Sequence, residues 1–263
     1  MINQKTIKNK LTQPIVSIIT VVKNGEKYLE ETIKSVINQK YKNIEYIIID
    51  GGSTDNTLKI LDEYRGIITV LVSEQDKGLY DAMNKGIIVA SGDVIGILNS
   101  DDLYQDSKVI KEVMDEFNNN SELDIIYGNL VYVKSDDTNK VIRNWISKKY
   151  YSQFFENGNV PPHPSLFVRR KVYHEAGLFD LDFKIAADYE FMLRIFKKNN
   201  FNSKYLNRLI VRMRLGGASN SSISGIIDQN KEVLKAWKKN KLKTTFYLML
   251  FRIFKRLIQF KKI

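Results

Sequence analysis

The first 120 residues alternate between short apolar runs and amphipathic segments, and this alternation restricts the chain to few folds. Apolar, β-branched runs predict buried strands at residues 15–22, 44–49, 67–72 and 94–98. Helical spacing of apolar residues predicts helices at residues 25–39, about 53–64, 79–90 and about 106–117. Strands that alternate with helices pack as a mostly parallel sheet flanked by helices. The expected fold class is therefore α/β.

The second half of the chain has a less regular pattern. We expect strands at residues 124–133, 140–145 and 165–168, a rigid loop at 161–164, a helix within 184–199 and long helices from about 225. The expected divisions are an N-terminal extension at 1–13, a main domain at 14–224 and a basic helical tail at 225–263. Residues 1–13 do not read as a signal peptide, and no run of 18 apolar residues occurs, so a cytoplasmic protein is expected.

Composition excludes several kinds of site. The 263 residues contain no cysteine, which excludes disulfides, thiolate–zinc and iron–sulfur sites and a cysteine nucleophile. The two histidines, His163 and His174, are too few to favour a zinc site made by the protein alone. The sequence has no GxGxxG after its first strand, no GxxxxGK[ST] and no GxSxG, which disfavours dinucleotide-binding, P-loop and serine-hydrolase chemistry.

The positive charge is concentrated at the C-terminal end. The formal net charge is +11, but residues 231–263 hold eleven basic residues and one acid, Glu232, so the rest of the chain is nearly neutral. Nucleic-acid binders more often place a basic patch on the folded domain, so no nucleic-acid partner is expected. From Phe246 to Ile263, apolar and basic side chains fall on opposite sides of a helix. This pattern favours binding of residues 244–263 to an anionic membrane surface; packing on the domain or on a second subunit is the alternative.

Polar side chains follow two of the predicted strands. Asp50 ends the second strand, and Asn99-Ser100-Asp101-Asp102 follows the fourth. Ligands of such sheets bind beyond the carboxyl ends of the strands. Mg²⁺ and Mn²⁺ use one or two carboxylates together with phosphate oxygens, so Asp101 and Asp102 suggest a metal–diphosphate site. Taken alone, these aspartates could also be a solvated turn, Asp188 a helix N-terminal acid, and His163 a structural residue.

Motifs in order along residues 14–220 resemble those of family 2 glycosyltransferases, in particular bacterial O-antigen and capsule enzymes. The segments that carry the resemblance are Val16–Asn24, Asp50–Thr57, Ser73–Gly86, Gly92–Asp102, His163–Arg170, Gly177–Asp180 and Ala187–Glu190. The resemblance implies a GT-A fold for residues 14–224, a nucleotide-sugar donor with UDP as the preferred nucleotide, and inversion at the anomeric carbon of a hexosyl donor. It also implies a saccharide or polyprenyl-linked acceptor, which strengthens a peripheral position on the inner face of the membrane.

Residue by residue, the resemblance assigns roles to matching positions. Asp101 matches the metal-binding end of the DxD motif, with Asn99 in place of the usual first aspartate, and implies a Mg²⁺ or Mn²⁺ cofactor. Asp188 matches the catalytic base, and His163 is placed near the acceptor. Arg212 and Arg214, with the loop at 216–219, are expected to close over the diphosphate. The residues expected around the nucleotide sugar are Thr20, Val22, Asn24, Asp50, Lys77, Asn84, Asn99, Ser100 and Asp102.

The leading functional hypothesis is thus an inverting sugar transferase of surface polysaccharide synthesis. A nucleotidyltransferase or sugar-phosphate pyrophosphorylase shares the sheet and metal chemistry, but those enzymes usually carry a glycine-rich basic loop where this chain has Lys23-Asn24-Gly25. A non-enzymatic membrane-surface protein would explain the basic tail and leave Asp50, Asp101 and Asp188 unexplained.

Overall fold

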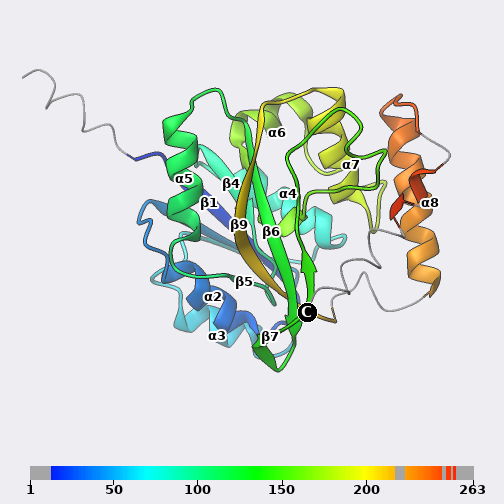
Figure 1. The fold of residues 1–263 in the computed structure, drawn as a ribbon. Coiled ribbons are helices and arrows are strands. Elements are labelled where there is room, and N and C mark those ends of the chain that lie inside the picture. Colours follow the sequence, from blue (N-terminus) through cyan, green and yellow to red (C-terminus); the bar gives the residue numbers. More distant parts are fainter. Residues whose placement is uncertain (1–12, 217–222, 245–246, 250, 253–263) are drawn as a thin grey trace, which may run out of the picture.

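The computed structural model describes residues 13–216, 223–244, 247–249 and 251–252, which form one mixed sheet flanked by helices (Figure 1). Within these residues the strand order is β3-β2-β1-β4-β8-β6-β9-β5, and β7 pairs with β6 off this path. The strands are β1 (Val16–Val22), β2 (Ile44–Asp50), β3 (Val70–Ser73), β4 (Val94–Ile97), β5 (Leu103–Tyr104), β6 (Ile125–Lys134), β7 (Asp137–Trp145), β8 (Leu166–Arg169) and β9 (Ser203–Arg214).

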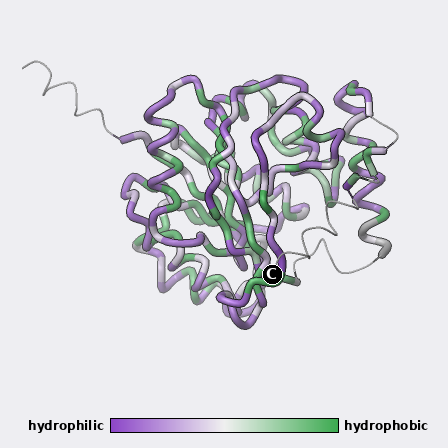
Figure 2. The backbone as a smooth tube through the Cα atoms, viewed as in Figure 1, coloured by the Kyte–Doolittle hydropathy of each residue, from purple (hydrophilic) through white to green (hydrophobic). Residues whose placement is uncertain are grey.

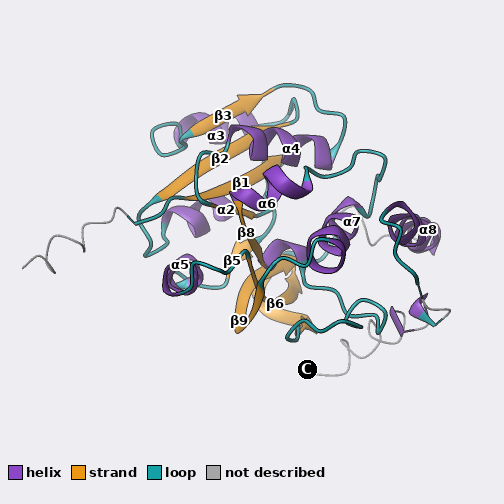
Figure 3. Cartoon of the chain, turned by 90° about the horizontal axis from the view of Figure 1, so that it is seen from above, coloured by secondary structure: helices purple, strands orange, loops and turns teal. Residues whose placement is uncertain are grey.

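Most of the helices lie on the two faces of this sheet (Figure 3). They are α2 (Leu29–Ile37), α3 (Thr57–Glu63), α4 (Leu79–Val89), α5 (Val109–Asn119), α6 (Arg170–Ala176), α7 (Ala187–Leu193) and α8 (Ile223–Lys239). A 3-10 turn, η1 (His163–Ser165), precedes β8, and a π-helical turn, η2 (Arg194–Lys198), continues α7. The expected α/β fold with a sheet flanked by helices is confirmed.

Both faces of β1 and β4, and of β2 from Tyr46 onward, are buried, which explains their continuous apolar runs, whereas β3 is partly exposed. Alternate residues of β1 enter different cores. Ile18 packs in the core that includes α2, α3 and α5, and Ile19 packs in the core that includes α4 and α7. Figure 2 shows the hydrophobic positions concentrated in the sheet and the hydrophilic ones in the outer loops.

The parallel part of the sheet places its polar strand ends together. β3, β2, β1 and β4 are parallel, with Val22 beside Asp50 and Asp50 beside Ser73. β8 then runs antiparallel to both β4 and β6, and so joins the two halves of the chain in one sheet. The sheet is therefore parallel in its first half and mixed overall.

Several element boundaries differ from expectation. The helix expected at 25–39 begins at Leu29. Helices α3 and α5 begin later than expected because the carboxylates of Asp55 and Asp106 bond the backbone N–H groups of Thr57 and Lys108 and form turns ahead of them. The helix expected within 184–199 begins at Ala187 and loosens into η2. β9, β5 and α6 are additional elements.

Helix α8 packs on α7, where Val233, Ala236 and Trp237 are buried in the core that also holds α4 (Figure 1). Leu248 is buried in the same core. Most of the amphipathic helix expected at 246–263 lies outside the described residues. Among the helices that the structure describes, none is long and apolar enough to cross a membrane.

Candidate active site

Asp50 is a buried carboxylate at the end of β2. Both of its oxygens lie 3.2 Å from the backbone N of Ser53, and Oδ2 accepts a hydrogen bond of 2.7 Å from Ser73 Oγ at the end of β3. A second carboxylate, that of Asp76, lies against the next residue, Gly51. Any larger residue at position 51 would clash with it, because a Cβ there would lie only 2.1 Å from Asp76 Oδ2. Negative charge is thus gathered at the ligand-binding edge of the parallel strands.

The loop after β1 is tied to the loop after β2. Asn24, at a positive φ of 54°, accepts a 2.8 Å bond from Thr54 N at Oδ1, and its own N–H donates to Ser53 Oγ at 2.7 Å. Thr20 is fully buried with Oγ1 3.2 Å from the Tyr46 hydroxyl, and Val22 is buried as well. In this structure these three predicted nucleotide-binding residues shape the loop and the core.

The loop after β4 carries the predicted metal-binding residues. Asp102 is fully buried and accepts bonds from Asn99 Nδ2 at 3.0 Å and from Arg214 N at 3.3 Å. Asn99 Oδ1 is buried and has no hydrogen-bond partner among the described residues. Asp101 is partly exposed, and the Ser100 carbonyl accepts a 2.9 Å bond from Thr32. Asp101 and Asn99 therefore offer ligand oxygens, whereas Asp102 holds the loop.

Electrostatics support a cation at this loop. Burial raises the pKa of Asp101 above its ordinary value. Burial and the neighbouring charge of Asp101 hold the pKa of Asp102 well above its usual range, and Arg214 offsets these effects in part. The described residues contain no group of three His, Cys, Asp or Glu that could hold a metal ion by themselves. Asp101 and Asn99 supply oxygen atoms of the type that Mg²⁺ and Mn²⁺ accept together with phosphate oxygens and water.

The two arginines expected at the diphosphate are engaged inside the protein. Arg214 is buried and donates to Asp101 O at 2.7 Å, to Ser135 O at 3.2 Å and to Glu31 Oε2 at 2.7 Å. Arg212 donates to Gln105 Oε1 at 2.8 Å and to Thr138 O at 2.7 Å. In this structure both guanidinium groups brace β9 and its neighbours, and their closure over a diphosphate stays a prediction. The loop at 217–219 lies outside the described residues.

Asp188 lies in the first turn of α7 and is partly exposed. Its Oδ1 accepts a 2.8 Å bond from the N–H of Tyr189 and lies 3.1 Å from the Tyr80 hydroxyl of α4. The same hydroxyl lies 2.8 Å from Ile185 O, so it links α4 to the segment before α7. Within the described residues, Oδ2 of Asp188 makes no hydrogen bond. One carboxylate oxygen is fixed, and the other is left for a ligand.

His163 and Asn84 lie around the same region. The His163 ring packs edge-on against Phe179 with 5.5 Å between ring centroids. Burial lowers the pKa of His163, and the charge of Asp188 opposes that effect, so a neutral imidazole lies within electrostatic reach of Asp188. The side-chain amide of Asn84 makes two 2.9 Å bonds to the backbone of Phe179 and so anchors this segment to α4. Lys77 is exposed just before α4, where its backbone N–H donates to Asp81.

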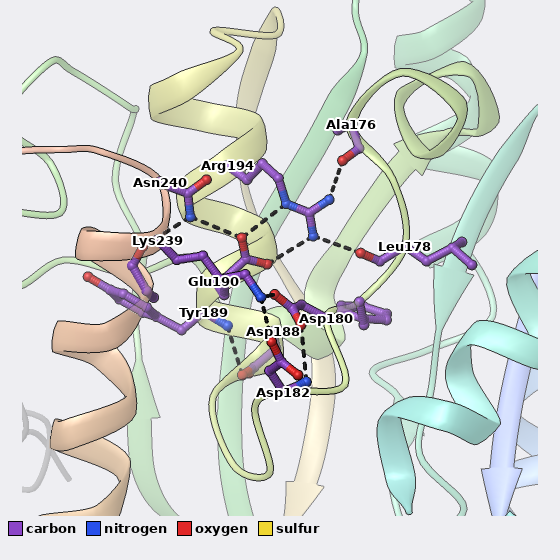
Figure 4. Close-up of polar contacts among 12 residues, drawn as sticks. Ala176, Leu178, Asp180, Asp182, Asp188, Tyr189, Glu190, Arg194, Lys239 and Asn240 are labelled. Carbon is purple, nitrogen blue, oxygen red and sulfur yellow. Dashed lines mark hydrogen bonds and ion pairs between the residues drawn. The ribbon is translucent and has the colours of Figure 1, made fainter. Parts of the chain in front are cut away.

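A buried polar network centred on Glu190 and Arg194 connects α7 to neighbouring segments (Figure 4). Glu190 accepts bonds from Arg194 Nε at 3.1 Å and Nη2 at 2.9 Å, and from Asn240 at 2.9 Å. Arg194 also donates to the carbonyls of Ala176 and Leu178. The network joins α7, the segment after α6 and the end of α8.

Sequence reasoning did not identify several residues of this site. Ser73 and Asp76 flank Asp50, Tyr80 contacts Asp188, and Glu232 of α8 bonds the segment before α7. Asp76 and Tyr80 lie inside the family-like segment Ser73–Gly86, and Glu232 is the one acidic residue of 231–263. The sequence therefore carried a signal for each of these residues. Pairing of Asp188 with Tyr80 joins positions 108 residues apart, which no local pattern reveals.

Sequence comparisons agree with this architecture. Residues 17–177 match the sequence model of the family described as glycosyl transferase family 2. An uncharacterized glycosyltransferase of Mycobacterium tuberculosis (strain ATCC 25618 / H37Rv) is 35% identical over 184 residues, which cover 69% of this chain and 68% of the relative. A PGL/p-HBAD biosynthesis glycosyltransferase of Mycobacterium bovis (strain BCG / Pasteur 1173P2) is 26% identical over 229 residues, covering 86% and 84% of the two chains.

Solved structures share the fold. S. aureus TarS 1-349 in complex with UDP is similar with a TM-score of 0.64 and 17% identity, over 93% of this chain and 69% of that one. This chain spans 43% of the longer TarS chain, with a TM-score of 0.60. A mannosyltransferase from Pyrobaculum calidifontis in complex with GDP-Man and Mn2+ is similar with a TM-score of 0.65 and 14% identity, over 94% and 70% of the two chains. Together with the strand-end carboxylates and the GT-A-like sheet, the family match over most of the first 177 residues shows that this chain belongs to glycosyl transferase family 2.

Proposed function

We propose that this glycosyltransferase moves a hexosyl group, with inversion, from a nucleotide sugar to a hydroxyl of a saccharide or lipid-linked saccharide. The observation that carries the proposal is the Asp188 carboxylate. Tyr80 and the N-terminus of α7 hold its Oδ1, and its Oδ2 is left without a hydrogen bond from the described residues. A carboxylate held in this way is oriented to accept a proton from a bound hydroxyl.

The proposed donor is a UDP-sugar bound over the ends of β1, β2 and β4. Support comes from the buried Asp50, the carboxylate of Asp76 beside Gly51, and the exposed Lys77 at the rim. TarS, which shares the fold, has been solved with UDP and with UDP-GlcNAc. Asp101 and Asn99 would hold Mg²⁺ or Mn²⁺, and such a cation, when bound, neutralises the charge of a leaving nucleoside diphosphate.

The chain's own residues account for the proton transfer. The acceptor oxygen forms a bond to the anomeric carbon as the bond from that carbon to the diphosphate oxygen breaks. Asp188 takes the acceptor's proton, and the nucleoside diphosphate leaves with the bonding electron pair. Attack opposite the leaving group turns an α-linked donor into a β-linked product. We assign to His163, whose neutral imidazole feels the charge of Asp188, a hydrogen bond to the acceptor.

The replacement Asp188→Asn tests the proposed base. General-base assistance is worth about 10²–10⁴-fold, so turnover should fall by about that factor. Nucleotide affinity measured by calorimetry should not change, because Asn keeps the side-chain shape and the donor edge is formed by other strands. Asp115→Asn, an exposed aspartate of α5 outside the proposed site, is the control and should keep normal turnover. Normal turnover by Asp188→Asn would refute the role of Asp188.

We further propose that the enzyme acts on the inner face of the cell membrane in surface polysaccharide synthesis, of the O-antigen or capsule kind. Besides the basic sequence of the tail, support comes from α8, where Ile227 and Leu234 are 51% and 45% exposed on a face that also carries Lys231 and Lys238. Apolar and basic side chains on one exposed face suit an anionic lipid surface.

Truncation tests membrane attachment. Removal of 253–263 keeps Leu248, which is buried in the core, and so spares the fold better than removal of 244–263. Vesicles with anionic headgroups should sediment the full chain and much less of the truncated one, and neutral vesicles should sediment neither. Equal sedimentation of both chains with anionic vesicles would contradict the proposed role of the tail.

A further inference from the structure

The carboxylate of Glu232 on α8 binds three successive backbone N–H groups that lie just before α7. Oε1 accepts a 2.9 Å bond from Lys184 N, and Oε2 accepts bonds of 2.9 Å from Ile185 N and 2.8 Å from Ala186 N. The Glu232 side chain is partly buried. Charge-assisted bonds of this kind are about twice as strong as neutral ones. They fix the backbone two residues ahead of Asp188.

The same segment is held from the opposite direction by α4. The Tyr80 hydroxyl lies 2.8 Å from Ile185 O and 3.1 Å from Asp188 Oδ1. The N–H of Ile185 thus donates to Glu232, and the carbonyl oxygen of Ile185 lies beside the Tyr80 hydroxyl. Burial, with the charges of Asp188 and Glu232, keeps the pKa of Tyr80 well above its usual range, so the hydroxyl stays a donor.

Helix α8 itself is held against α7, and this packing holds Glu232 in place. Trp237 Nε1 donates to the hydroxyl of Tyr189, the residue after Asp188, at 2.8 Å, and Trp237 is buried. Lys239 forms ion pairs with Asp180 and Asp182 at the start of the same loop. The part of the tail that forms α8 is therefore built against the segment that carries the proposed base.

We propose that Glu232 is a positioning residue for transfer, and that it acts by holding residues 184–186 so that the Asp188 carboxylate faces the acceptor hydroxyl. This inference rests on the proposed role of Asp188. A displacement of about 1 Å in a reacting group can cost about 10²-fold in rate. Within the described part of the chain, the side-chain hydrogen bonds of Glu232 go to residues 184–186 and not to the proposed donor edge, so its effect should fall on turnover and not on donor binding.

The test compares Glu232→Gln with Asp228→Asn. A glutamine offers one acceptor oxygen and turns an NH₂ group toward backbone N–H donors, so the three bonds cannot all be kept. We expect kcat to fall about 10- to 100-fold, with unchanged donor KM and unchanged UDP affinity by calorimetry, which also reports that the variant is folded. Asp228 lies one turn earlier on α8 and pairs with Lys231 at 3.0 Å, so Asp228→Asn should leave kcat unchanged.

A double replacement separates positioning from general structural support. Because Glu232 acts through Asp188, adding Glu232→Gln to Asp188→Asn should lower the residual rate by less than about twofold. If Glu232→Gln leaves kcat unchanged, or lowers the rate equally in both backgrounds, the positioning role is overturned while the proposed base stands. If Asp188→Asn retains normal turnover, the proposed base is overturned first, and the positioning role is overturned with it.

Discussion

Replacement of Arg194 by Met should destabilise the protein strongly, because it leaves a buried carboxylate without its main partner. The side chains of Glu190 and Arg194 are 4% and 12% exposed, and two guanidinium nitrogens bond the carboxylate. After the replacement, Asn240 still donates to Glu190 at 2.9 Å, and the carbonyls of Ala176 and Leu178 lose their donor. Met retains part of the alkyl packing, so the loss is mainly electrostatic.

Breaking a buried ion pair by removing one partner costs about 3–5 kcal/mol of the free energy of unfolding. In a chain of this size, 1 kcal/mol shifts Tm by about 2–4 °C, so Tm should fall by about 6–20 °C. The control is Lys111→Met, which removes an exposed pair of the same helical spacing, with side chains of Lys111 and Asp115 that are 52% and 46% exposed. Its cost should be about 0–1 kcal/mol.

Urea unfolding and calorimetric melting at neutral pH measure both variants. Adding Glu190→Met to Arg194→Met should recover part of the loss, because an apolar pair can replace a buried ion pair at little cost. If the Tm of Arg194→Met lies within a few degrees of the Tm of Lys111→Met, the Glu190–Arg194 network does not stabilise α7 as proposed.

Three further predictions concern the site. Because the pKa of Asp101 is raised in the fold, its charge lowers native stability at pH 7, so Asp101→Asn should raise the Tm of the metal-free protein and abolish any rise in Tm caused by Mn²⁺. Burial lowers the pKa of His163, so its contribution to the free energy of unfolding should be complete above about pH 6.5 and should be lost as the pH falls below that value. In melting curves at several pH values, His163→Gln should flatten this dependence of Tm on pH. The replacement His174→Gln, at an exposed histidine, should leave the dependence unchanged. Tyr80→Phe removes a hydroxyl from Asp188, and turnover should fall about 3- to 10-fold in the transferase assay, with unchanged nucleotide affinity.

The sequence predicted well those parts of the fold whose pattern is local. β1, β2 and β4 lie within about a residue of expectation, because strands buried on both faces are continuous apolar runs. β9 was missed because its polar and apolar residues mix along a half-exposed strand, and its pairing with β6 depends on residues 78 or more positions away. The mixed order of the sheet likewise follows from long-range pairing, which no local periodicity encodes.

The candidate site was predicted in position more than in detail. Asp50 and Asp101 follow β2 and β4, the two strands that flank β1 and run parallel to it, so both lie at the same edge of the sheet, as the alternation of strands and helices implies. Residue type alone could not tell that Arg214 would be buried on Glu31 and Asp101, or that Asp102 would turn inward to Asn99. Burial is decided by which elements meet in space, and the sequence shows those encounters only indirectly.

A calorimetric titration of UDP, with GDP and dTDP alongside, tests the proposed donor site most directly when it is run with and without Mn²⁺ on the wild-type protein and on Asp101→Asn. We expect metal-dependent binding of UDP to the wild-type protein, with binding lost or greatly weakened in the variant. Binding of UDP that is equal with and without Mn²⁺, or equal in the two proteins, would contradict a donor site built on Asp101.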